Sequence, residues 1–196
     1  DSYSGQIDTL FGEGGLSNIM TFKKVNKVVG NTRINVVEDY EYTEYCSKTY
    51  GRLFHPDNIQ PFSPKIHAIC KAIERSTGTV LIYSKYLKGG LLPIALALEE
   101  MGISRYCYAS HVSSLLKEKQ PPLDPLTMKP KKDNSDLHAK YVMITGTMEY
   151  SPDNVKDLER VFHPDNKDGR LVKVVLISQA GSEGIDFKCI RQVHIL

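Results

Sequence analysis

One short apolar segment constrains the fold of this chain more than any other part of its sequence. Residues 171–178 read Leu-Val-Lys-Val-Val-Leu-Ile-Ser, the length and composition of a strand that is buried on both faces. The sequence then changes abruptly to small and polar residues, with Gly181 and Gly184 three positions apart. Because open parallel sheets bind ligands at the carboxyl ends of their strands, this segment predicts an α/β fold with a ligand near the turn.

The turn itself carries the chemistry of a phosphate and ribose site. Gly181 and Gly184 would let the backbone approach a phosphate, and Asp186 offers acceptor oxygens for a ribose hydroxyl. Further polar side chains come from Gln179, Ser182 and Glu183. The spacing also fits a tight strand-to-helix turn with no ligand, so the rest of the chain has to decide between the two interpretations.

Helices and strands alternate along the chain from residue 64 onward. Helices are predicted from Pro64, capped by Ser63, to Gly78; over 91–101; and from Ser151-Pro152 to residue 162. Strands are predicted at 80–84, 104–109, 140–145, 171–178 and 192–196. This alternation predicts a parallel sheet that is flanked by helices and joined by right-handed crossovers.

Several segments resemble motifs of a known family of motor ATPases. Residues 178–186, Ser-Gln-Ala-Gly-Ser-Glu-Gly-Ile-Asp, resemble motif V of superfamily-2 helicases and translocases, which are built from two RecA-like lobes. Together with Val-His-Ile-Leu at 193–196, they are most similar to helicase-like proteins of large cytoplasmic DNA viruses: the poxvirus nucleoside triphosphate phosphohydrolases and their asfarvirus and giant-virus relatives. Residues 80–86, Val-Leu-Ile-Tyr-Ser-Lys-Tyr, resemble motif IV, and Thr145-Gly146 followed by a helix resembles the step before motif V.

The resemblance implies a domain organisation and a set of residue roles. Residues 63–196 would form the second RecA-like lobe, ending before motif VI. Residues 1–62 lie outside that pattern; strands at 21–29 and 33–37 predict a β-hairpin there, and the segment is either the connector between lobes or a hairpin insertion docked on the sheet. The residues that would hold nucleic-acid phosphates, without reading sequence, are Ser84, Lys85, Ser178, Gln179, Ala180, Gly181 and Ser182. Those that would contact ATP between the lobes are Glu183, Gly184 and Asp186. For Ser84 and Lys85 the alternative is an ordinary polar strand end.

Two motifs of such a motor are missing from the sequence. There is no Gly-x-x-x-x-Gly-Lys-Ser/Thr loop and no Asp-Glu box for magnesium, which this family carries on its first lobe. The arginine of motif VI, which stabilises charge on the transferring phosphoryl group, would follow Leu196. We therefore expect ATP and Mg²⁺ to be held mainly by a first lobe of the same parent protein, and this polypeptide alone to be inactive. The implied partners are that lobe and a nucleic acid, DNA rather than RNA.

Composition narrows the class of protein without locating a site. With 196 residues, 41% hydrophobic and 24% charged, and a net charge of +2, the chain fits a globular domain in which any nucleic-acid site is local. No apolar run is long enough to cross a membrane, the six histidines show no metal spacing, and the four cysteines are expected to be reduced core residues. We expect an intracellular protein with no metal site of its own, in the host cytoplasm or the virion if it is viral.

Four other segments carry separate predictions. Residues 12–15, Gly-Glu-Gly-Gly, predict a flexible loop, and the tyrosines among acidic residues at 40–50 predict packing or a protein contact rather than base stacking. Residues 121–136, with four prolines and three lysines, predict a solvated loop, with a salt-sensitive phosphate contact as the alternative. Phe-His-Pro-Asp-Asn occurs at both 54–58 and 162–166, which indicates either coincidence or two similar turns.

The main competing interpretation is a noncatalytic α/β module that binds a nucleotide or a protein. Such a module should carry a complete phosphate loop of its own, and between residues 80 and 102 the chain offers only Lys-Gly-Gly at 88–90. No paired carboxylates or nucleophile elbow support a nuclease or a protease. Nucleic-acid binding with a steep salt dependence would favour the motor lobe, whereas firm protein binding without it would favour the module.

Overall fold

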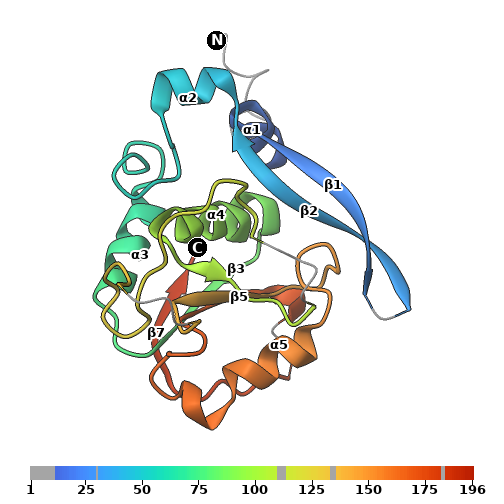
Figure 1. The fold of residues 1–196 in the computed structure, drawn as a ribbon, viewed down its shortest axis with the longest axis vertical. Coiled ribbons are helices and arrows are strands. Elements are labelled where there is room, and N and C mark those ends of the chain that lie inside the picture. Colours follow the sequence, from blue (N-terminus) through green and yellow to red (C-terminus); the bar gives the residue numbers. More distant parts are fainter. Residues whose placement is uncertain (1–11, 30, 110–113, 133–135, 182–183) are drawn as a thin grey trace.

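The computed structural model describes residues 12–29, 31–109, 114–132, 136–181 and 184–196 (Figure 1). Its elements in chain order are α1 (Gly12–Ile19), β1 (Met20–Val29), β2 (Thr32–Tyr42), α2 (Glu44–Tyr50), α3 (Pro64–Glu74), β3 (Thr79–Ser84), the π-helical turn η2 (Leu87–Leu91), α4 (Leu92–Met101), β4 (Ser104–Arg105), β5 (Lys140–Ile144), α5 (Asn154–Val161), the 3₁₀ turn η3 (Pro164–Asn166), β6 (Val174–Ser178), the 3₁₀ turn η4 (Gln179–Gly181) and β7 (Ile190–Ile195). None of the described helices combines the length and apolar character needed to span a bilayer.

A five-stranded parallel sheet forms the centre of the fold, in the order β4-β5-β6-β3-β7. β3 pairs with β6 along its length, so the two strands end together at Ser84 and Ser178. Alternate residues of β6 join different cores: Leu176 packs with α3 and α4, whereas Ile177 packs with α5. The predicted class is therefore confirmed, because helices cover both faces of a parallel sheet and the antiparallel pair β1-β2 forms a hairpin at its side (Figure 1).

Local signals at the helix ends explain where α3 and α4 begin and end. The Ser63 hydroxyl accepts the N–H of Ile66 at 3.3 Å, and Pro64 occupies the first helical position, as predicted. α4 ends at Gly102 in the left-handed region with φ 95°, which also confirms the prediction. α3, however, ends at Glu74, before the predicted stop at Gly78.

β4 is much shorter than the strand predicted over 104–109. Only Ser104 and Arg105 pair with β5. The backbone then leaves the sheet, because the N–H of Tyr108 donates to the carboxylate of Asp157 on α5 at 2.6 Å, and Ala109 packs against the hairpin. Tertiary contacts end this strand, and no local sequence signal marks them.

The buried carboxyl group of Asp157 makes stability depend on pH. Asp157 is 1% exposed, and burial raises the pKa of its carboxyl group to about 6 from an ordinary value of 3.8. The folded state therefore holds the proton more tightly than the unfolded state, and the chain loses stability as the pH rises from about 4 to about 6.

We expect Asp157→Asn to raise the free energy of unfolding by about 1–2 kcal/mol near pH 7.5, because the amide oxygen still accepts the Tyr108 N–H without a buried charge. The gain should largely disappear near pH 3, below both pKa values, where the carboxyl is mostly protonated in the folded and the unfolded state. Urea titrations of both proteins at the two pH values measure this difference. A gain that is equal at both pH values would contradict the role given to ionisation.

The predicted start of α5 is displaced by two residues. Its N-cap is Asp153, whose carboxylate accepts the N–H of Lys156 at 3.0 Å. Ser151, the predicted cap, is instead buried, and its hydroxyl lies 2.6 Å from the Thr145 hydroxyl. Both positions offer capping chemistry, and the prediction failed because the turn after β5 uses Ser151 for its own hydrogen bonds.

Residues 12–15 do not form the predicted flexible loop, since they begin α1. Glycine costs roughly 1 kcal/mol per residue in a helix relative to alanine, so local propensity argues against this helix. The helix nevertheless buries Leu16 in the main core, and Gly12 lies against Gly89 of η2. Packing against the lobe outweighs the unfavourable propensity.

The hairpin and α2 region share one hydrophobic core with the sheet. Tyr40 of β2 and Phe54 belong to the same buried cluster as Ile82 of β3 and Leu96 of α4. Tyr40 thus packs inside the protein, as predicted, whereas Tyr45 is 64% exposed. The predicted division into residues 1–62 and 63–196 stays a prediction about chain organisation, and the core crosses that boundary.

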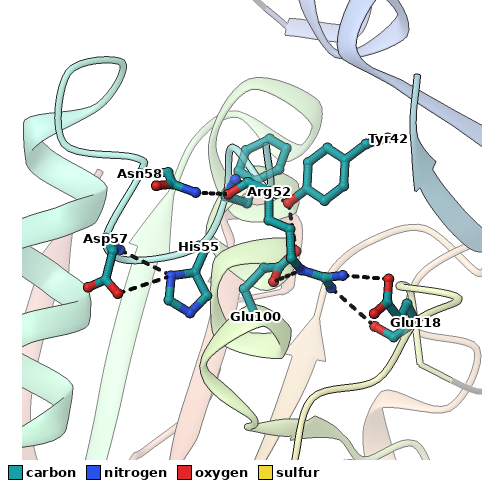
Figure 2. Close-up of polar contacts among 8 residues, drawn as sticks. Tyr42, Arg52, His55, Asp57, Asn58, Glu100 and Glu118 are labelled. Atoms are coloured by element: carbon teal, nitrogen blue, oxygen red, sulfur yellow. Dashed lines mark hydrogen bonds and ion pairs between the residues drawn. The ribbon is translucent and has the colours of Figure 1, made fainter. Parts of the chain in front are cut away.

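A polar network also connects the segment around Tyr42 and Arg52 to α4 of the sheet region (Figure 2). The Arg52 guanidinium contacts two carboxylates, with Nε 2.8 Å from Glu100 Oε2 on α4 and Nη1 2.5 Å from Glu118 Oε2. Glu100 also accepts the hydroxyl hydrogen of Tyr42 at 2.6 Å, and that hydroxyl accepts the N–H of Phe54 at 3.1 Å. Burial and the neighbouring Glu100 raise the pKa of Tyr42, so it stays a neutral donor.

The two copies of Phe-His-Pro-Asp-Asn fold into matching turns. In each turn the histidine Nδ1 accepts the backbone N–H two residues later, at 3.3 Å for His55 and 3.2 Å for His163. The same nitrogen lies 3.6 Å from an aspartate oxygen in both copies, as Figure 2 shows for His55 and Asp57. The interpretation as two similar turns is confirmed.

Two predictions about burial are corrected. Leu123 and Met128 are 9% and 8% exposed and belong to the main core, so the 121–136 segment is anchored at these residues, while most of its other described residues are exposed as predicted. Of the free thiols, Cys46 and Cys70 are buried as predicted, Cys107 is half-buried and Cys189 is exposed. Cys189 lies in the turn just before β7, with φ 63°, and not on a strand.

Candidate functional site

The carboxyl ends of three neighbouring strands form one hollow on the lobe. β3, β6 and β5 run parallel and end side by side, with Ser84 opposite Ser178 and Ile144 opposite Ile177. The residues that follow these strands line an open cavity of about 520 Å³: Lys85, Leu87, Thr145, Gly146, Thr147, Ser178, Gln179 and Ala180. The predicted residues from two distant segments are thus brought together.

The composition of this hollow suits an anionic ligand. Lys85 is exposed at its rim, and Thr147, Gln179 and Ala180 are exposed beside it. No carboxylate is among the described residues that line it. A cation, hydroxyl groups and an amide, with no opposing negative charge, are the groups that proteins use to hold phosphates.

Close packing fixes the shape of the hollow at two glycines. A Cβ at Gly181 would lie 2.7 Å from the carbonyl carbon of Ile144 and closer still to its oxygen. A Cβ at Gly146 would lie 2.6 Å from the Cβ of Ala180. Gly181 also donates its N–H to the Ser178 hydroxyl at 3.4 Å. These glycines let the turn after β6 lie directly on the turn after β5.

A hydroxyl network holds the turn after β5. The N–H of Thr145 donates to the Ser151 hydroxyl at 2.9 Å, and the Asn154 amide donates to the Thr145 carbonyl at 2.7 Å. The N–H of Thr147 donates to the Thr145 hydroxyl at 3.3 Å. Thr147 is therefore presented at the rim by a turn that is tied to α5.

Ser84 has a positioning role in this structure. It is 1% exposed, and its hydroxyl accepts the N–H of Tyr86 and donates to the Tyr86 carbonyl, both at 3.1 Å. A Cβ at Gly90 would overlap this hydroxyl, so Gly90 makes room for it. The contacts shape the turn that carries Lys85 and engage the Ser84 hydroxyl within the protein, and Ser84 is not among the described residues that line the hollow.

Gly184 and Asp186 lie in a different hollow from Lys85. A cavity of about 620 Å³ includes both residues and the end of α5, with Lys167 and Lys188 among its lining residues. Gly184 has φ 73° and open space where a Cβ would stand, and Asp186 is exposed. The two predicted groups of site residues are therefore separate, while Ser182 and Glu183 lie outside the described residues.

Sequence reasoning missed Thr147 and Leu87 as lining residues. The resemblance of Thr145-Gly146 to the step before motif V correctly marks the end of β5. Because the carboxyl ends of adjacent parallel strands meet at one edge, the residues just after Gly146 could have been assigned to the hollow. Leu87 carries no such signal.

Comparisons with known proteins find relatives of this chain among large DNA viruses. It is 32% identical over 198 aligned residues to a termination factor NPH-I homolog of African swine fever virus. The alignment covers 94% of this chain and 27% of the relative. It is 45% identical over 53 residues to nucleoside triphosphatase I of Choristoneura biennis entomopoxvirus, covering 25% of this chain and 8% of that protein. The chain is homologous to the helicase-like proteins of large DNA viruses.

A third relative extends these viral helicase-like proteins to giant viruses. It is a protein of Acanthamoeba polyphaga mimivirus named a "Putative ATP-dependent RNA helicase", 30% identical over 138 residues, or 70% of this chain and 21% of the relative. No protein-family model matches the chain, and no solved structure matches it significantly. The chain spans 27% of the length of the African swine fever virus relatives, so it corresponds to about a quarter of such a protein.

Proposed function

We propose that this chain is the second RecA-like lobe of an ATP-driven nucleic-acid helicase or translocase and that the hollow beside Lys85 holds the nucleic-acid backbone. The observation that carries this proposal is the hollow where β3, β6 and β5 end together, which is lined by Lys85 and polar groups and by no carboxylate of the described residues. The relationship to viral helicase-like proteins supports the same function.

The backbone contact is made without base recognition. Lys85 provides a mobile positive charge, while the exposed Gln179 and Thr147 offer neutral donors beside it. Ala180 and Gly181 contribute the turn backbone, and Ser178 holds that turn through its hydroxyl. Ser182, the next residue in the sequence, is proposed as a further phosphate contact. The ligand we propose is DNA rather than RNA, although names of relatives include both a termination factor and an RNA helicase.

The ATP contact is assigned to the second hollow and its neighbours. Asp186 can accept a hydrogen bond from a ribose hydroxyl, and Lys167 and Lys188 supply positive charge in the same cavity, so these residues fit one side of a nucleotide. Gly184 has no neighbouring atom on its side-chain position, so a nucleotide can approach its backbone. Glu183, the preceding residue in the sequence, is proposed as a further ATP contact. The triphosphate and Mg²⁺ would be held mainly by the first lobe, whose closure on ATP would move the two lobes relative to each other.

The polypeptide by itself is therefore expected to release no phosphate from ATP above background. No P-loop occurs in its sequence, and no group of three or more His, Cys, Asp or Glu side chains gathers for a metal ion within the described residues. A phosphate-release assay with Mg²⁺ and with or without DNA tests this expectation. Turnover that follows the chain through purification and disappears in an Asp186→Ala variant would contradict it.

Replacing Lys85 with glutamine should weaken binding of a labelled single-stranded DNA about 3- to 10-fold at low salt, because one phosphate contact is lost. It should also lower the slope of log K against log salt by about 1. Fluorescence anisotropy over about 50–200 mM salt measures both quantities. Lys71→Gln, in the last turn of α3, is the matched control with the same charge change, and it should keep the wild-type slope.

Two outcomes would count against the proposal. If Lys85→Gln and Lys71→Gln bind alike, the hollow is not the backbone site. If the wild-type chain binds no nucleic acid at any salt concentration and instead binds a protein firmly, it is a noncatalytic interaction module. We place the parent protein inside the cell, in the host cytoplasm or the virion, as part of the same proposal.

A further inference from the structure

The hairpin presents one face to the protein and one to solvent. On the inner face, Val25, Ile34 and Val36 pack with Cys107 and Ala109, which follow β4. The outer face of the distal half carries exposed side chains from both strands: Lys24, Asn26, Val28, Arg33 and Asn35. Asn26 pairs directly with Asn35, and Val28 with Arg33, so the five form one continuous surface, here called the ribbon face.

The ribbon face is basic because the hairpin's carboxylates lie elsewhere and are engaged. Glu38 pairs with Lys27 at 2.5 Å, and Asp39 pairs with Lys23 at 3.2 Å; on β2 both carboxylates lie nearer the base of the hairpin than Arg33 and Asn35 do. Within the described part of the chain no carboxylate lies within ion-pair distance of Lys24 or Arg33. The Lys24 ammonium lies over the Phe22 ring, 5.9 Å from its centroid.

The hairpin lies at the β4 edge of the sheet, beside β5, one of the three strands whose ends form the hollow. Tyr40 of β2 has its hydroxyl 3.5 Å from that of Tyr150, which closes the turn after β5. The inner face of the hairpin covers the segment after β4, the last strand of the sheet. Figure 1 shows the hairpin running along this side to a tip that stands clear of the lobe. The hairpin therefore lies beside the turn that presents Thr147 at the rim of the hollow.

We propose that the ribbon face binds the backbone of a double-helical nucleic acid, adjacent to the single strand held in the hollow. A two-stranded β-ribbon fits the major groove, and the ribbon face on β1, from Lys24 to Val28, extends about 14 Å, or roughly four base pairs of duplex. Lys24 and Arg33 neutralise phosphates, and Asn26 and Asn35 supply amide donors between them. The path of the nucleic acid rests on the proposed function, whereas the shape and charge of the ribbon face do not.

The test uses a double variant of the whole 196-residue chain, Lys24→Gln with Arg33→Gln. Anisotropy of a labelled blunt duplex should show binding weakened about 10-fold or more, with the salt slope lowered by about 2, because two phosphate contacts are removed. Binding of a short single strand should change much less than it does for Lys85→Gln. Unchanged thermal unfolding midpoints establish that each variant is folded.

The matched control is Lys71→Gln with Arg75→Gln, which removes the same two charges from the end of α3. This control should keep the wild-type duplex affinity and salt slope. The inference is overturned if the ribbon variant binds duplex like the wild type, or if the control loses as much affinity. If Lys85→Gln weakens single-strand binding while the ribbon variant does not alter duplex binding, the proposed function stands and the ribbon inference alone fails. If the wild type binds neither nucleic acid, both fail.

Discussion

Replacing Glu99 with alanine is expected to lower the free energy of unfolding by about 3–5 kcal/mol. This α4 carboxylate is 4% exposed and accepts hydrogen bonds from the N–H of Leu115 at 2.9 Å, the N–H of Leu116 at 2.7 Å and the hydroxyl of Tyr141 at 2.7 Å, as well as from the Ser114 hydroxyl. Alanine would leave these donors buried without their acceptor. The cost comes mainly from the unsatisfied donors and not from the lost side-chain volume.

Urea titration of Glu99→Ala measures this loss, with Glu159→Ala as the control. Glu159 lies on α5 with a 59% exposed side chain and forms a surface ion pair with Lys156, so its removal should cost no more than about 0.5 kcal/mol. Glu99→Gln should recover only part of the stability, because its amide nitrogen cannot accept a hydrogen bond. Similar unfolding free energies for the alanine variants at 99 and 159 would show that the Glu99 network adds little.

Gly181→Ala is expected to destabilise the chain by about 2–4 kcal/mol and to abolish nucleic-acid binding in the hollow. The new methyl group would enter the space of the Ile144 carbonyl, which belongs to the end of β5 and cannot move without disturbing the sheet. The turn that carries Gln179 and Ala180 would therefore be displaced from the turn that carries Thr147.

Gly184→Ala, three residues later, measures the cost of a left-handed backbone conformation at a position where an added methyl group meets no neighbour. Gly184 has φ 73°, but no atom lies within 4 Å of the place that an alanine methyl group would take, so alanine should cost about 1–2 kcal/mol through the left-handed conformation alone. This variant should retain binding of single-stranded DNA. Thermal unfolding and anisotropy on both proteins distinguish the two effects, and equal losses of binding would contradict the packing argument for Gly181.

Much of the lobe could be predicted because its signals are local. The buried strand β6, the Ser63-Pro64 start of α3 and the glycine at the end of α4 each carry a pattern that a short segment supplies by itself. The order of these elements then determined the sheet class, and the ends of β3 and β6 met as parallel strands require.

The failures occur where distant parts of the chain decide the local structure. β4 ends early because Asp157 on α5 and the hairpin both draw the following segment out of the sheet. α1 forms from a glycine-rich sequence because Leu16 reaches the main core. In the site, the phosphate contact expected of Ser84 stays a prediction, and its burial beneath the Lys85 turn depends on Gly90 of the next element, which the motif does not reveal.

The most direct test of the central claim is photocrosslinking from the hollow to a nucleic acid. A photoreactive residue at Thr147, on the rim beside Lys85, should capture labelled single-stranded DNA in a salt-sensitive manner. The same residue at Thr77, exposed just before the amino end of β3, should capture little. Capture at position 147 that disappears in Lys85→Gln is the predicted result. Equal capture at both positions, or none at 147 while the chain binds DNA, would show that the carboxyl edge of the sheet is not the nucleic-acid site.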